Sequence, residues 1–119
     1  MTESLNLKRY DLEERTFKFA HCVNQYINKV PRSVTNLENC KQLARSAGSI
    51  GANYIEANES LSKKDFVMRI KISRKEAKES RFWLMLIEPL EKELKEKEYL
   101  IDESSQLMKI FGSILEKSK

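Results

Sequence analysis

Apolar residues recur every three or four positions along most of the chain, which is the period of an amphipathic α-helix. The pattern predicts four helices, near residues 11–30, 36–59, 62–88 and 102–116. No segment shows the strict alternation of a half-buried β-strand. Four such helices joined by short connectors predict an all-α fold, an antiparallel up-and-down four-helix bundle, with residues 1–119 forming a single domain.

Capping signals set the expected limits of the first helix. Asp11 with Glu14 three residues later forms a capping-box pattern, which predicts that the helix begins there. The helix should end before Pro31, since proline disfavours helical geometry in the residue that precedes it. Its expected buried stripe consists of Phe17, Ala20, Val23, Ile27 and Val30.

The second helix carries an unusually wide apolar sector. A seam with alternating steps of three and four is expected to face a partner helix. It comprises Leu37, Cys40, Ala44, Ala47, Gly51, Tyr54 and Asn58. Leu43, Ile50 and Ala57 form an adjoining stripe, so this helix is expected to be buried on more than one side, deep in the bundle or also in a subunit contact. Gly48 and Gly51 weaken a helix, and their presence indicates close packing of another backbone.

The third helix has the clearest signals of the four. Ser62 and Asp65 stand in the relation of an N-cap and its third helical residue, and Pro89 marks the end. Its expected seam is Phe66, Ile70, Ser73, Ala77, Ser80, Leu84 and Ile87. The charged stretch at residues 90–98 is interpreted as a solvated extension or connector. The fourth helix should then begin near Asp102, with Leu107, Phe111 and Ile114 as its seam.

The residues of common catalytic and metal sites are scarce. His21 is the only histidine, so a di-iron bundle site with paired Glu-x-x-His motifs is excluded, and the expected role of His21 is that of a partly buried structural residue. Cys22 and Cys40 provide too few ligands for zinc and are expected to be reduced, buried thiols. The segment from Gly48 to Gly51 lacks the strand and the Lys-Ser/Thr ending of a phosphate-binding loop. We therefore expect a protein that is not an enzyme and that has no metal and no cofactor.

Composition and charge indicate where the protein is located and which helix is basic. The chain has only three Gly and two Pro in 119 residues, and it shows neither a signal peptide nor a long apolar run, so a cytoplasmic protein is expected. Residues 62–88 contain eight Lys or Arg against four acids, and hence most of the basic excess. Its candidate phosphate contacts are Lys64, Lys71, Arg74, Lys75, Lys78 and Arg81. The alternative is that these lysines only keep a helix face soluble.

The second and third helices resemble a known family. The residues that carry the resemblance are Arg45–Ala57 (RSAGSIGANYIEA), Asp65 with Phe66, Lys75–Glu79 (KEAKE) and Phe82–Leu84 (FWL). They resemble the four-helix-bundle proteins encoded in intervening sequences of bacterial 23S rRNA genes, and the likeness covers nearly the whole chain. These proteins are in turn similar to the accessory variability-determinant bundles of diversity-generating retroelements. The charged stretch at residues 90–98 departs from the family pattern, where a shorter connector is expected.

The resemblance implies a homo-oligomer, most simply a five-membered ring, and no catalytic residue. Residues that could form the contact between subunits lie on the second and third helices: Ile50, Asn53, Tyr54, Met68 and Phe82. The leading hypothesis is a non-enzymatic oligomer that binds RNA or DNA through the basic face of the third helix. The alternative is a structural or protein-interaction scaffold with no nucleic-acid role.

Overall fold

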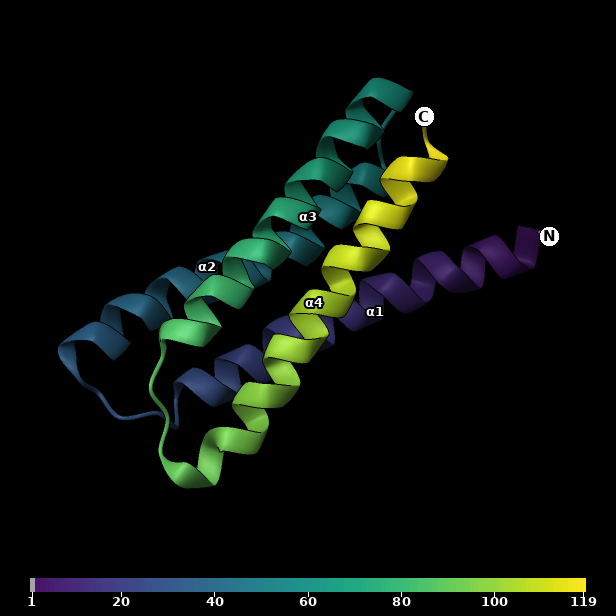
Figure 1. Cartoon of the computed structure of the whole chain (residues 1–119). Coiled ribbons are helices and arrows are strands. Elements are labelled where there is room, and N and C mark those ends of the chain that lie inside the picture. Colours follow the sequence, from purple (N-terminus) through teal and green to yellow (C-terminus); the bar gives the residue numbers. More distant parts are fainter. Residues whose placement is uncertain (1) are drawn as a thin grey trace.

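Four long helices make up the bundle in the computed structural model, which describes residues 2–119, with side chains from Asp11 onward. They are α1 (Thr2–Ile27), α2 (Val34–Asn58), α3 (Lys63–Leu86) and α4 (Leu94–Lys117), with a short 3₁₀ turn, η1 (Glu91–Glu93), before α4. Figure 1 shows the helices running up and down beside one another, with the first turns of α1 projecting away from the rest. The described part of the chain contains no β-strand, which confirms the all-α four-helix bundle.

The helices do not pack equally well against one another. α2 and α3 form the most extensive pair, followed by α3 with α4 and by α1 with α2, whereas α1 and α4 make few contacts. In Figure 1 the N-terminal part of α1 diverges from α4. The bundle is therefore tightly closed around the α2–α3 pair and more open between α1 and α4.

Serine caps begin the two central helices. The Ser33 side chain accepts a hydrogen bond from the Asn36 backbone N–H at 3.2 Å, and Ser62 accepts one from the Asp65 N–H at 3.1 Å. The predicted start of α3 is thus confirmed. Asn36, buried at the start of α2, bonds the backbone of Glu88 in both directions, at 2.8 and 2.9 Å, and so ties the ends of α2 and α3 together.

Two predicted helix starts are wrong. α1 begins at Thr2, so Asp11 lies inside the helix and does not cap it. Residues 2–10 contain neither Gly nor Pro, and nothing in the sequence interrupts the helix there. α4 begins at Leu94 instead of Asp102. The charged stretch at residues 90–98 forms η1 and the first residues of α4, and within it Glu93 is buried. The Glu93 Oε1 atom accepts a hydrogen bond from the Leu90 N–H at 2.9 Å, just before α4 begins.

The predicted stripe of α1 is also partly wrong. Phe17 is 73% exposed, while Val23 and Val30 are buried as expected. The buried seam is Leu12, Thr16, Phe19, Val23, Tyr26 and Val30. Thr16 can join it because its hydroxyl donates to the Glu13 carbonyl at 3.1 Å, which satisfies the polar group inside the core. His21 is exposed, not partly buried, and its ring lies parallel to that of Phe17 with centroids 6.3 Å apart.

The core face of α2 is centred on the adjoining stripe, and the seam predicted to face a partner helix lies to one side of it. Leu43, Ile50 and Ala57 are fully buried, whereas Leu37, expected in the main seam, is 43% exposed. The seam of α3 matches the prediction, with Phe66 half-buried and the other six residues buried. Leu107 and Phe111 of α4 are buried as expected and Ile114 is half-buried. Cys22 and Cys40 are free, half-buried thiols.

None of the helices in the described residues is long and apolar enough to cross a lipid bilayer.

Candidate nucleic-acid interface

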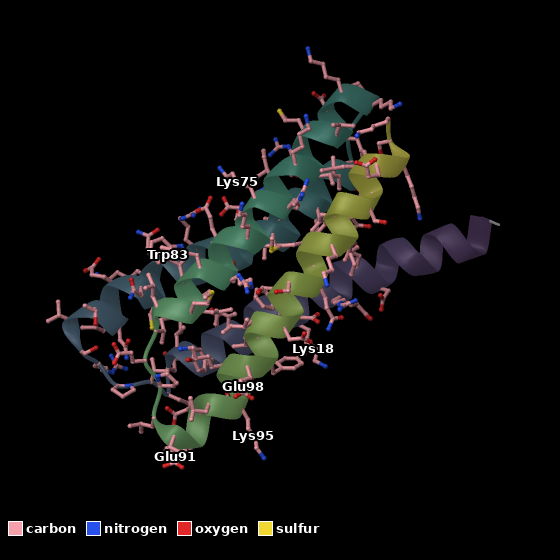
Figure 2. The ribbon with its side chains drawn as sticks, viewed as in Figure 1. Lys18, Lys75, Trp83, Glu91, Lys95 and Glu98 are labelled. Carbon is pink, nitrogen blue, oxygen red and sulfur yellow. The ribbon has the colours of Figure 1, made fainter. Side chains whose placement is uncertain are left out.

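Most basic side chains of α3 lie on its outer surface. All six candidate phosphate contacts are exposed: Lys64, Lys71, Arg74, Lys75, Lys78 and Arg81. We call this set the α3 basic face. At 1.5 Å per residue it extends along about 26 Å of helix. Figure 2 shows Lys75 on the side of α3 that points away from the bundle.

Two of the three acids of α3, Glu76 and Glu79, pair with Arg45 of α2. Glu76 is buried and accepts two hydrogen bonds from the Arg45 guanidinium of α2, both at 3.3 Å. Glu79 also pairs with Arg45 at 3.3 Å and lies 4.0 Å from the Lys75 ammonium. The Arg45 pKa is raised above its usual value, first because of its hydrogen bond with Glu76 and then because of that carboxylate's charge. Both acids are therefore drawn toward α2.

Five of the six basic groups remain without a carboxylate partner. Among the described side chains, Lys75 is the one member of the α3 basic face with a carboxylate within 4 Å. The Arg74 side chain lies along the seam with α4, where a Cβ atom placed on Gly112 would be 3.8 Å from its Nε atom. This surface thus presents unneutralised cations to solvent, as an interface with a polyanion requires.

A hollow of about 560 Å³ lies at the first turn of α3. Its walls include Lys63, Lys64, Met68 and Lys71, with Asp65 as the acid among them. The free backbone N–H groups of a helix start carry partial positive charge, which adds to that of the lysines. Three lysines therefore gather around the hollow at this end of the α3 basic face.

The structure separates the expected subunit-contact residues into two groups. Ile50 and Tyr54 are buried in the core of the chain itself, and Asn53 accepts a hydrogen bond from the Arg69 guanidinium at 3.0 Å. Met68 and Phe82 remain on the surface, 46% and 55% exposed. Of the five predicted contact residues, only Met68 and Phe82 therefore offer exposed apolar area to another molecule.

Sequence reasoning missed other exposed apolar residues near Phe82. Met85 is 53% exposed and Leu86 is 45% exposed. The rings of Phe82 and Trp83 pack edge to face, with their centroids 5.0 Å apart. The sequence does contain a signal for them, because residues 82–87 (FWLMLI) are all apolar. Such a run has more apolar positions than one core face of a helix can bury. This group, Phe82 with Met85 and Leu86, extends the apolar surface toward the end of α3.

A second ion pair that the sequence did not indicate joins α1 to α4. The Arg15 guanidinium donates to both carboxylate oxygens of Glu103, at 2.7 and 2.9 Å, and also to the Gln106 side chain at 2.7 Å. This contact raises the Arg15 pKa, chiefly through the hydrogen bond to Glu103. The two partners lie 88 positions apart, so no local pattern could reveal the pair.

Comparison with known proteins bears on the fold and the family. The family profile described as 23S rRNA-intervening sequence protein matches residues 8–113. A similar solved structure is a crystal structure of a protein of unknown function from the S23 ribosomal protein family of Bacteroides thetaiotaomicron. That protein is 30% identical, with a TM-score of 0.73 over 92% of this chain and 98% of that chain. No match was found among curated protein sequences.

Neither description names an enzymatic activity. The family profile covers most of the chain, in agreement with the resemblance at Arg45–Ala57 and the segments that follow it. The four-helix architecture and the similar crystal structure are consistent with that match. The chain therefore belongs to the 23S rRNA-intervening sequence protein family.

Proposed function

We propose that this chain is a non-enzymatic, homo-oligomeric protein of the cytoplasm that binds nucleic acid through the α3 basic face. The observation that carries the proposal is the separation of charge on α3. Glu76 and Glu79, two of its three acids, pair with Arg45, while five cations of the α3 basic face are exposed and have no carboxylate partner among the described side chains. Each lysine or arginine that neutralises a phosphate releases a counterion, so such a face favours RNA or DNA of any sequence.

Oligomerisation would strengthen this interaction. The resemblance implies a homo-oligomer, and we propose a five-membered ring with Met68 and Phe82 at or near the contacts between subunits. Several copies of a modest basic face on one assembly raise the overall affinity through effective concentration. Native mass spectrometry gives the subunit number directly, and a monomer at micromolar concentration would contradict this part of the proposal.

The test of the proposal is a charge reversal on α3. Lys71, Lys75 and Lys78 are changed together to Glu, and binding to a structured RNA hairpin and to a matched DNA duplex is measured at several salt concentrations. We expect much weaker binding and a salt dependence, log K against log [salt], that is shallower by about one unit for each phosphate that is no longer neutralised. Unchanged affinity in a folded triple variant refutes the proposed interface.

A matched control separates the face from the net charge. Lys92, Lys95 and Lys109 are exposed and have no carboxylate within 4 Å among the described side chains. Their joint change to Glu alters the total charge by the same amount away from α3. We expect the control to retain most of the binding, and an equal loss in both variants would indicate a nonspecific charge effect.

The exposed apolar group on α3 favours a second candidate, a structural or protein-interaction scaffold without a nucleic-acid role. Phe82 and Met85 are more than half exposed, and apolar surface of this kind is typical of protein contacts. In this case the lysines keep the helix soluble or meet an acidic partner protein. Recovery of one stoichiometric protein partner, with no binding to either nucleic acid at low salt, would favour the scaffold.

A further inference from the structure

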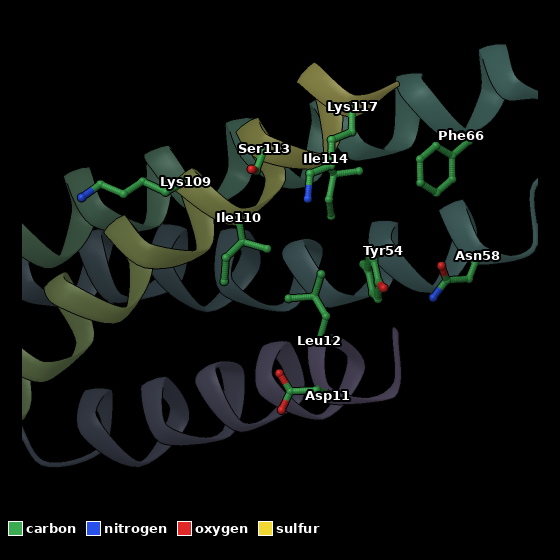
Figure 3. A pocket seen from close by; sticks show the side chains of 10 residues that line it. All are labelled: Asp11, Leu12, Tyr54, Asn58, Phe66, Lys109, Ile110, Ser113, Ile114 and Lys117. Carbon is green, nitrogen blue, oxygen red and sulfur yellow. The ribbon is translucent and has the colours of Figure 1, made fainter. Parts of the chain in front are cut away.

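A cavity of about 640 Å³ lies between the helices at the end where α1 diverges from α4. Every helix contributes an apolar side chain to it, namely Leu12 of α1, Tyr54 of α2, Phe66 of α3, and Ile110 and Ile114 of α4. Figure 3 shows these side chains directed toward a common space. The volume falls within the range of roughly 300–1,000 Å³ that is typical of small-molecule sites.

The packing of the bundle keeps this space open. Tyr54 and Phe111 pack against each other with ring centroids 5.9 Å apart and form part of the core beside the cavity. The Asn58 amide donates to the Glu13 carboxylate at 3.0 Å and ties the end of α2 to α1. Because α1 and α4 make few contacts with each other, neither helix closes the remaining side. The described side chains thus leave the cavity open toward the gap between α1 and α4.

The charges at the rim differ from one wall to the other. Figure 3 shows the Lys117 side chain bending back toward Ile114, whereas the Lys109 side chain reaches away from the cavity. Neither lysine has a carboxylate within 4 Å among the described side chains. Asp11 lies on the opposite wall, on α1. A single ammonium directed at an apolar space favours a ligand whose anionic group lies at the α4 rim, away from Asp11.

We propose that this cavity binds an anionic amphiphile, a molecule with an apolar body and one carboxylate or sulfonate group. The anionic group lies beside the Lys117 ammonium, and the apolar body lies against Leu12, Tyr54 and Ile114. This site is separate from the α3 basic face and does not depend on nucleic-acid binding. Apolar burial supplies most of the affinity, and Lys117 selects the sign of the charge.

The experiment uses the full-length protein and three probes with the same ten-carbon tail: decanoate, decylammonium and decanol. Each probe is tested below its micelle concentration for displacement of the fluorescent anion anilinonaphthalene sulfonate. We expect one site per chain and tighter binding of decanoate than of decylammonium by about tenfold or more, as one charge-assisted hydrogen bond implies. Equal binding of the two charged probes, or no displacement by decanoate, overturns the proposal.

Two variants locate the site. Lys117→Met keeps the aliphatic stem and should weaken decanoate about tenfold, with little effect on decanol. Ile114→Trp fills the cavity and should weaken all three probes. Lys95→Met, on the same helix but outside the cavity lining, is the matched control and should change none of them.

Circular dichroism and melting temperature establish that each variant is folded. If Ile114→Trp does not fold, the comparison of decanoate with decanol in Lys117→Met still decides the proposal. Decanoate binding that survives both substitutions in folded protein overturns it. The variant with Glu at Lys71, Lys75 and Lys78 should bind decanoate normally, so failure of the α3 basic face and failure of this cavity are distinguishable.

Discussion

The contact between α1 and α2 at Gly51 allows a sharp test of how closely the two helices pack. A Cβ atom added at Gly51 would lie 2.9 Å from the Oγ1 atom and 3.3 Å from the Cβ atom of Thr16 on α1. Gly48, one turn earlier on the same helix, has nothing within 4 Å of such an atom. The two glycines therefore form a matched pair, one against a neighbouring helix and one in open space.

The expected magnitudes follow from two opposing effects. Replacing a glycine by alanine inside a helix contributes about 1 kcal/mol of stability through helix propensity. Gly48→Ala should gain that amount, because nothing opposes it. Gly51→Ala should gain the same amount through helix propensity. It should also lose about 1–3 kcal/mol of stability through overpacking, because Thr16 is buried and must shift. The free energies of unfolding of the two variants should thus differ by about 1–3 kcal/mol, with Gly48→Ala the more stable.

Thermal and urea unfolding at one fixed protomer concentration measure this difference, which corresponds to a difference in melting temperature of about 4 °C or more. Gly51→Leu should be worse than Gly51→Ala by a few kcal/mol, since the larger side chain forces the backbones apart. Thr16→Ala combined with Gly51→Ala should recover part of the stability, because the closest clashing atom is removed. Equal stability of Gly48→Ala and Gly51→Ala would refute this account of the helix contact.

Three further outcomes follow from polar groups that are buried or half-buried. Ser46 and Ser80 share a hydrogen bond of 2.8 Å in the α2–α3 interface; Ser80→Ala should cost about 1–3 kcal/mol in urea unfolding, and a second change, Ser46→Ala, should add little. Burial raises the pKa of Tyr26 well above its ordinary value of 10.0, so its stabilising contribution is complete below pH 10 and declines above it. Tyr26→Phe should therefore give a flatter fall in stability above pH 10, and an unchanged slope would contradict the assignment. Burial also raises the pKa of Cys40, so its thiol should react with a disulfide reagent at pH 8 more slowly than a free thiol does.

The third helix was predictable because its capping residue, its terminating proline and its apolar spacing all indicate the same helix. Ser62 caps it, Pro89 follows its end, and the seam from Phe66 to Ile87 repeats with regular steps. The first helix was less predictable, because two different stripes share Val23 and Val30. Residue polarity favours the stripe with Phe17 over the stripe with Thr16, but Thr16 is buried and Phe17 is exposed. A threonine whose hydroxyl bonds its own helix is compatible with a core, and periodicity alone does not reveal this.

The candidate interface could be predicted only in part, for a related reason. Helical spacing places Lys71, Lys75 and Lys78 on one face of α3, and the structure agrees. Whether those charges are neutralised depends on partners from other helices, which no local pattern contains. The pairing of Arg45 with Glu76 spans 31 positions, and it directs one acid of α3 toward α2. The cavity beside Lys117 likewise depends on the divergence of α1 from α4.

Several of the residues that carry the family resemblance lie in the contact between α2 and α3. Arg45 bonds Glu76, the backbone carbonyl of Ile50 accepts a hydrogen bond from Ser73 at 2.9 Å, and Asn53 accepts one from Arg69. These residues therefore specify how two helices pair, and family membership informs the fold more than it informs the ligand.

The same reasoning decides where function must be tested. Arg45→Ala would leave the buried Glu76 carboxylate without its partner, at a cost of about 1–3 kcal/mol. Weaker nucleic-acid binding by that variant would then report unfolding as readily as the removal of a phosphate-binding group. The outer lysines of α3 have no such structural role, since they are exposed and all but Lys75 lack a carboxylate within 4 Å among the described side chains. Substitutions at Lys71 and Lys78 therefore test the interface, whereas substitutions at Arg45 or Glu76 test the fold.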